Sequence, residues 1–153
     1  MTKHDPPSNP FSTRHRMILV VLALALLALL VTAARLEPSS RGFGTHQQLG
    51  LGECFVVQQW GVRCPSCGMT TAWTRLLHGD LQGAVAANTG GVLLCVAAMA
   101  AVPWLLASAA VGRWCYLRPT ASLVLPAVAV VALIVVFDWM RHTGLALLLE
   151  RIP

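Results

Sequence analysis

The chain has 153 residues, of which 56% are hydrophobic and 11% are charged. A soluble domain is usually roughly 45–50% apolar and about 25% charged, and the mean hydropathy here is +0.67. This composition excludes a free soluble domain and a wholly disordered chain. The 11 lysines and arginines are dispersed rather than gathered in one stripe, which excludes nucleic acid as the expected partner. A lipid bilayer is the expected surrounding.

The chain begins with a polar segment and a first apolar run. Residues 1–16 hold Lys3, Arg14 and Arg16 among several prolines, which predicts a disordered basic tail. Residues 17–34 follow without a charge, and a spanning helix needs about 17–25 apolar residues, so this run predicts the first crossing. The alternative is a secretory signal. Its apolar region would be about 7–15 residues long, so the length of this run favours a retained anchor.

Residues 35–88 form the long polar segment of the chain and are expected outside the membrane. Within it, residues 65–78 begin with a proline and are followed by Gly79, as the two ends of a helix often are. Apolar residues recur there at spacings of three and four: Met69, Ala72, Trp73, Leu76 and Leu77. The pattern predicts a short helix at the membrane interface, too short to span, that carries a CxxC motif.

Two further apolar runs complete a single membrane domain of residues 17–153. Residues 89–112 and 119–137 are each long enough to cross. Runs this continuous exclude the alternating strands of a barrel. Asp138 ends the last run and is expected to pair with Arg141 at the membrane surface. The predicted fold class is an all-α integral membrane protein with three transmembrane helices and the short interfacial helix.

The distribution of lysine and arginine predicts the orientation. The tail has three such residues in 16 and the turn at 113–118 has two, whereas segment 35–88 has four in 54. Because cytoplasmic loops carry the excess of these residues, the tail and the turn are expected in the cytoplasm. Segment 35–88 and the C-terminus are then outside. The chain is predicted to be a multi-pass protein of the cell membrane with a cytoplasmic N-terminus.

The polar segment contains a candidate metal site. Zinc in a closed site takes four nitrogen or sulfur ligands, and a single CxxC supplies two. The predicted ligands are Cys54, Cys64, Cys67 and His78, with His46 as a substitute in the fourth place. Cys95 lies in a spanning run and Cys115 is expected on the opposite side of the membrane, so neither is expected to be a ligand.

Two other interpretations of these cysteines remain open. Cys64, just ahead of Pro65 at an expected helix start, would have its thiolate stabilised by the helix dipole. Cys64 and Cys67 would then suit thiol–disulfide chemistry, with Cys54 as a third, exchanging thiol. Alternatively, the cysteines only pin a tight turn, as a disulfide or as small buried thiols.

A motif around the cysteines is similar to that of a known family. Its residues are Cys54, Cys64-Pro65-x-Cys67-Gly68-x-Thr70, Gly79-Asp80-x-x-x-Ala84 and Asn88. In this combination, over about residues 50–100, the chain resembles the uncharacterised bacterial membrane family catalogued as domain of unknown function 2752. Many members have arginine after the motif threonine, a place that Thr71 takes here. The resemblance implies the membrane architecture and no particular activity.

The sequence therefore predicts a non-enzymatic membrane subunit or accessory protein with a structural cysteine cluster. Zinc is its candidate cofactor, and other membrane proteins are its candidate partners. The alternative is a membrane thiol–disulfide oxidoreductase that uses Cys64 and Cys67. Solute transport is disfavoured because no spanning run holds an interior charge.

Overall fold

The structure, a computed structural model, describes residues 10–149, with side chains as far as Thr143. Residues 1–9 of the expected tail and residues 150–153 lie outside this part of the chain. The described residues form helices and connecting turns without a strand. In chain order the helices are α1 (Thr13–Arg35), the 3-10 turn η1 (Thr45–Leu49), α2 (Phe55–Trp60), α3 (Met69–Leu77), α4 (Leu81–Ala87), α5 (Thr89–Val111) and α6 (Ala121–Leu149). The all-helical prediction is confirmed.

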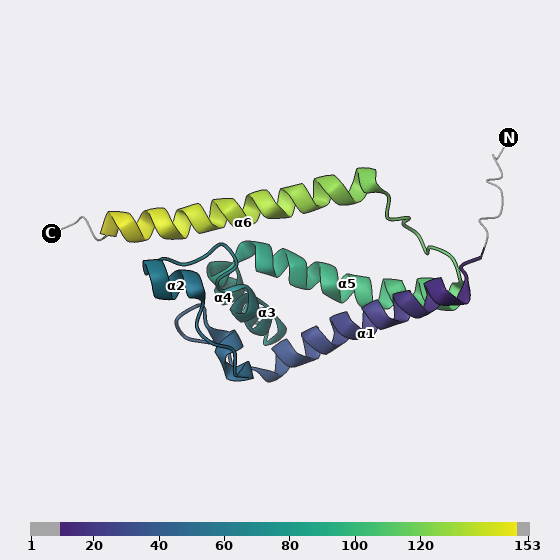
Figure 1. The fold of residues 1–153 in the computed structure, drawn as a ribbon, viewed down its shortest axis with the longest axis horizontal. Helices are drawn as coiled ribbons and strands as arrows, with labels where there is room; N and C mark the ends of the chain where they lie inside the picture. The colour runs from purple at the N-terminus through teal and green to yellow at the C-terminus, as the bar shows by residue number, and fades with distance from the viewer. Residues whose placement is uncertain (1–9, 150–153) are drawn as a thin grey trace.

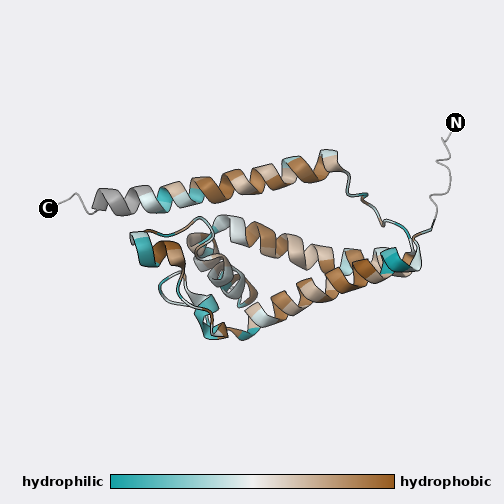
Figure 2. Cartoon of the chain, viewed as in Figure 1, coloured by the Kyte–Doolittle hydropathy of each residue, from teal (hydrophilic) through white to brown (hydrophobic). Residues whose placement is uncertain are grey.

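Three of these helices, α1, α5 and α6, are long and apolar enough to cross a membrane. Figure 2 shows the hydrophobic residues concentrated along them. The three candidate spans are Thr13–Arg35, Thr89–Val111 and Ala121–Thr143, and they indicate a multi-pass membrane protein. In Figure 1, α5 lies between α1 and α6, and the short helices gather at one end of α1 and α5.

At the other end of the bundle, Arg16 joins the start of α1 to the end of α5. α1 begins at Thr13, before the expected span, because Ser12 acts as its N-cap and accepts a hydrogen bond from the His15 amide. Arg16, which was expected in the tail, therefore lies in α1. Its guanidinium donates to the carbonyls of Ala109 at 2.6 Å and Ala110 at 3.0 Å. A cation is stabilising at a helix C-terminus, so this contact fixes the end of α5 against the start of α1.

The third long helix continues beyond its expected end. The apolar run stops before Asp138, but α6 extends through it to Leu149. Asp138 is 4% exposed and its carboxylate has several partners, so the charge is accommodated inside the helix. Gly90 allows α6 to approach α5 at this end, because a Cβ on Gly90 would collide with Val135.

The expected helix at residues 65–78 is shorter in the structure and covers Met69–Leu77. Pro65 and Ser66 lie in a turn closed by hydrogen bonds from the Cys67 amide to the Cys64 carbonyl and from Met69 to Ser66. α3 packs against α1, α4 and α5. Its Ala72 is fully buried in an apolar cluster with residues of α4 and α5. α3 therefore closes the end of the α1–α5 pair.

Candidate metal centre

Three cysteines meet outside the candidate spans. The sulfur of Cys64 lies 3.5 Å from that of Cys54 and 3.1 Å from that of Cys67, and all three sulfurs lie within 4.8 Å of one another. Cys54 immediately precedes α2, whereas Cys64 and Cys67 belong to the turn before α3. All three are half-buried free thiols. The structure thus brings together three of the four predicted ligands.

The two histidines considered for the fourth place lie in different surroundings. His46 lines the same cavity of about 370 Å³ as the three cysteines. His78 follows the end of α3, and its Nε2 lies 3.1 Å from the Ala34 carbonyl at the end of α1. The structure therefore does not bring His78 to the sulfurs.

The other two cysteines lie elsewhere, as expected. Cys95 is fully buried in α5, in an apolar cluster with Leu30 and Ala98. Cys115 follows the C-terminal end of α5, and its amide donates to the Ser108 hydroxyl. Neither thiol belongs to the cluster.

Gly68 is required for the position of the cysteine turn. Its φ of +87° lies in the left-handed region, which favours glycine. A Cβ at this position would lie 2.5 Å from the Ala87 carbonyl oxygen and 2.9 Å from that of Gly42. The glycine of the CPxCG motif therefore allows the turn to pack directly on the backbone at the end of α4.

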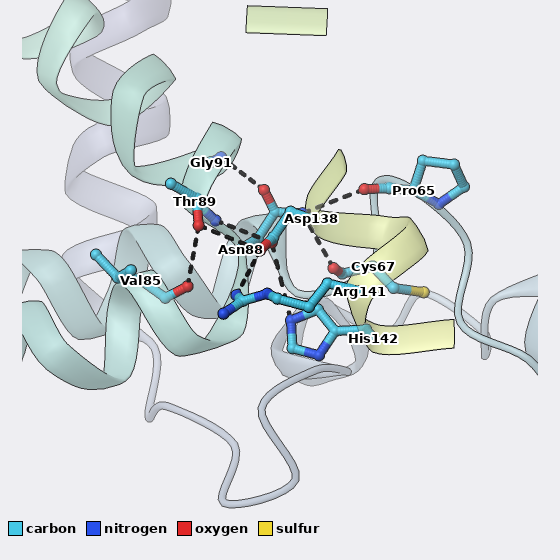
Figure 3. Close-up of polar contacts among 9 residues, drawn as sticks. All are labelled: Pro65, Cys67, Val85, Asn88, Thr89, Gly91, Asp138, Arg141 and His142. Atoms are coloured by element: carbon cyan, nitrogen blue, oxygen red, sulfur yellow. Dashed lines mark hydrogen bonds and ion pairs between the residues drawn. The ribbon is translucent and has the colours of Figure 1, made fainter. Parts of the chain in front are cut away.

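Asn88 fixes the same turn from the start of α5. Its amide nitrogen donates to the carbonyls of Pro65 and Cys67, both at 3.2 Å, and its side-chain oxygen accepts from the Gly91 amide at 2.7 Å. Figure 3 shows these contacts. Asn88 is the N-cap of α5, and the same side chain also positions the cysteine turn.

α6 contacts this region through two further residues. The Asp138 carboxylate accepts hydrogen bonds from the Thr89 amide at 3.2 Å and from the Thr89 hydroxyl at 3.3 Å. It also pairs with Arg141 at 2.7 Å, as predicted, and lies 3.8 Å from His142 (Figure 3). The Trp139 indole donates to the Arg63 carbonyl at 2.6 Å, immediately before the cysteine turn. The cysteine turn is therefore held between α5 and α6.

The Gly79-Asp80 part of the motif has a structural role. Asp80 is the N-cap of α4 and accepts from the Gly83 amide at 2.8 Å. It also pairs with Arg75 at 2.9 Å, and Arg75 reaches the Ser39 carbonyl at 3.2 Å. These contacts join α3, α4 and the loop after α1.

The thiols of the CxxC motif have shifted pKa values in opposite directions. Partial burial raises the pKa of Cys64, but hydrogen bonds to its sulfur from Ser66, Cys67 and Cys54 outweigh it, and the pKa falls from 9.0 to about 7. Burial and the neighbouring Cys64 raise the pKa of Cys67 to about 12. Cys64 precedes the start of α3 by a turn, so these hydrogen bonds, rather than the expected helix terminus, stabilise its thiolate.

The lowered pKa of Cys64 predicts its reactivity in the metal-free protein. Below its pKa the thiolate fraction rises about tenfold per pH unit, so alkylation by iodoacetamide should accelerate up to about pH 7 and then level off. Cys67 should stay largely unmodified up to about pH 9 because its raised pKa keeps it a thiol. Mass spectrometry of each peptide measures both rates. Equal pH profiles for the two cysteines would contradict this prediction.

Sequence reasoning missed two residues that organise the site. Thr45 is fully buried, and its hydroxyl lies 2.8 Å from that of Thr71, which connects η1 to α3. No sequence signal distinguishes Thr45 from a loop threonine. For Trp139 the sequence did contain an indication. A buried indole N–H usually finds a hydrogen-bond acceptor, and this one follows a carboxylate at the end of an apolar run. Its acceptor, however, lies far away in the chain.

No curated protein and no solved structure matches this chain. A family model described as "Protein of unknown function (DUF2752)" matches residues 54–107. This stretch runs from the first cysteine of the cluster into α5 and includes all three clustered cysteines and Asn88. The resemblance inferred from the cysteine motif is thereby confirmed for residues 54–107, the part of the chain that is similar to the DUF2752 family.

Proposed function

We propose that this chain is a multi-pass membrane protein that binds one zinc ion through Cys54, Cys64 and Cys67. The observation that carries the proposal is the meeting of three sulfurs, from two separate stretches of chain, within 4.8 Å of one another. Thiolates are ligands that select zinc and other soft or borderline metal ions. In the proposed site the ion joins the start of α2 to the turn before α3.

The spacing of the sulfurs supports a tetrahedral ion. With zinc–sulfur bonds of about 2.3 Å, the ligand sulfurs of a tetrahedral site lie about 3.8 Å apart. The separations of 3.1 Å (Cys64 to Cys67) and 3.5 Å (Cys54 to Cys64) would widen by about 0.7 and 0.3 Å to reach this value. The neighbouring cavity of about 370 Å³ leaves room for this change. The thiolate that Cys64 forms near neutral pH favours metal binding as well.

We further propose that the site faces the outside of the cell and that the protein acts as an accessory subunit rather than an enzyme. The lower density of lysine and arginine in segment 35–88 supports the orientation. The turn that carries Cys64 and Cys67 precedes α3 and is held by the N-cap of α5 and by α6. An ion at this point would stabilise the end of the bundle and present a fixed surface to other membrane proteins.

Metal analysis of the purified protein tests the zinc proposal. The full chain, purified in detergent with its thiols reduced, should contain about one zinc per chain by mass spectrometry of the metal. Cys54→Ser, Cys64→Ser and Cys67→Ser should each lose most of it. Cys115→Ser, the matched control at the other end of the bundle, should retain it. A metal-free wild type that takes up no added zinc, or full retention in the cluster variants, would overturn the proposal.

Thiol–disulfide exchange is a second candidate function. It is favoured by the 3.1 Å between the sulfurs of Cys64 and Cys67 and by their opposite pKa shifts. In this reaction the two thiols form a disulfide and give two electrons and two protons to a partner disulfide, which becomes two thiols. Formation of a Cys64–Cys67 disulfide when the reduced, metal-free protein is mixed with a disulfide-bonded peptide, with release of the two peptide thiols, would support this function. Inertness of the reduced, metal-free pair toward that peptide would exclude it.

A further inference from the structure

We propose that His46 is the fourth ligand of the metal site and closes its coordination shell. This inference rests on the proposed zinc site. It concerns the kind of site: a zinc ion with four protein ligands is structural, whereas a catalytic zinc keeps one position open for water or substrate. His46 lies outside the residues that match the family model, so the match does not assign it.

The local structure explains how His46 comes to the cluster. It is the second residue of η1, a turn flanked by Gly44 and Gly50, both in the left-handed region. The preceding Thr45 is fully buried, and its hydroxyl accepts from the Ser39 amide at 3.1 Å and lies 2.8 Å from the Thr71 hydroxyl. Thr71 belongs to α3, the helix that follows Cys67 and Gly68. The same helix therefore positions both the cysteine turn and η1.

The surroundings of His46 fit a ligand. His46 is one of the residues that line the cavity with the three cysteines, and it is half-buried. Among the described residues no hydrogen bond engages the ring, so both nitrogens are available to a metal ion. Neutral imidazole is a usual zinc ligand, with a bond of about 2.0–2.1 Å.

Other side chains near the cluster are already engaged or chemically less suitable. The His78 ring contacts the Ala34 carbonyl and does not line the cavity. The Ser66 hydroxyl is bonded to the Cys64 sulfur. Met69 packs against Gly91 of α5, and its thioether suits a softer ion such as Cu(I). The nitrogens of His46 do not lie within 4.8 Å of all three sulfurs, so its side chain turns toward them when the ion binds. Three thiolates and this imidazole are the set that the cavity provides for zinc.

Closure by His46 has a consequence for the role of the site. The ion then joins three separate segments: η1, the residue before α2, and the turn between Cys64 and Cys67. Each segment is in turn tied to the bundle, η1 through Thr45 and the turn through Asn88. The metal would cross-link the extramembrane segment as a structural ion, with no open coordination position for catalysis.

Cobalt substitution of the full chain in detergent tests this inference, because tetrahedral Co²⁺ reports its ligands by its visible absorption. His46→Ala should weaken Co²⁺ affinity by about tenfold or more, since even the loss of a residue that only orients a ligand costs about 10–100-fold. His78→Ala, the matched histidine control, should leave the affinity and the spectrum unchanged. His46→Cys should retain the ion and strengthen the sulfur-to-cobalt charge-transfer band.

The outcomes separate the inference from the proposed function. Equal affinities and spectra for the wild type and His46→Ala would overturn His46 as a ligand while leaving the three-cysteine site in place. Loss of the ion in His78→Ala would also overturn it. Failure of the reduced wild type to bind Co²⁺ or Zn²⁺ would instead refute the proposed function. Circular dichroism of each variant checks that the helices are retained, and recovery of binding in His46→Cys shows that the position itself is competent.

Discussion

Asn88→Ala is expected to lower the free energy of unfolding by about 2–4 kcal/mol. The side chain is 3% exposed and its removal leaves three backbone groups without their partner: the carbonyls of Pro65 and Cys67 and the amide of Gly91. Each buried polar group without a partner costs about 1–3 kcal/mol, and water that enters the space left by the side chain recovers part of this cost. Unfolding by sodium dodecyl sulfate in mixed micelles, followed by circular dichroism, measures the change.

The same substitution is expected to weaken metal binding, because Asn88 holds the backbone on both sides of Ser66. Residues that orient metal ligands typically contribute about 10–100-fold to affinity. Asn88→Ser is the matched control for the N-cap. Its hydroxyl still accepts from the helix amide, so it should recover about 1 kcal/mol of stability. It cannot reach both carbonyls, and the metal affinity should stay low. Wild-type affinity in Asn88→Ala would show that the turn does not depend on this residue.

The long helices could be predicted from the sequence because their signal is local. An uncharged run of sufficient length is visible without knowledge of its neighbours, and α5 was predicted almost to its ends. α6 was not, since the expected end rested on the charge of Asp138. That charge is tolerated in the helix because of Thr89, a residue 49 positions away in the chain, and no local pattern reveals such a partner.

In the candidate site, too, the local features could be predicted and the contacts between distant residues could not. The clustering of Cys54 with Cys64 and Cys67 followed from composition and from their common extramembrane segment. The fourth position depended on which histidine the fold brings into the cavity. His78 was the first choice because it lies in the same expected extramembrane segment, eleven residues after Cys67, but α3 directs it to the end of α1. His46 reaches the cavity through the contact between Thr45 and Thr71, which is a tertiary interaction without a sequence signature.

Asp138→Ala is the substitution expected to destabilise the chain most, by about 3–5 kcal/mol. The Asp138 side chain is 6% exposed and is paired with Arg141. Removal of the carboxylate leaves the Thr89 amide and hydroxyl without their acceptor. A hydrogen bond to a charged group contributes about 1.5–3 kcal/mol, so the loss of these two bonds accounts for most of the expected cost. The same unfolding measurement in mixed micelles tests the value.

The packing of α6 explains why one carboxylate has so large an effect. Large apolar side chains of α6 from Leu123 to Phe137 are exposed, and in the bilayer they would contact lipid. Within the part whose side chains are described, the polar contacts that join α6 to the rest of the chain are those of Asp138 with Thr89 and of Trp139 with the Arg63 carbonyl. Without the carboxylate, the third crossing loses its main specific attachment to α5.

Two control variants distinguish a buried carboxylate from a simple surface ion pair. Arg141→Ala removes the charged partner, whose side chain is 55% exposed, and should change stability by less than about 1 kcal/mol because solvent screens such a pair. Asp138→Asn keeps an oxygen acceptor for Thr89. Its loss of stability should lie between those of Arg141→Ala and Asp138→Ala. If Arg141→Ala were as destabilising as Asp138→Ala, the ion pair, rather than the hydrogen bonds from Thr89 to Asp138, would hold α6 in place. If neither variant changed stability, α6 would be attached by its apolar contacts, such as Val135 against Gly90.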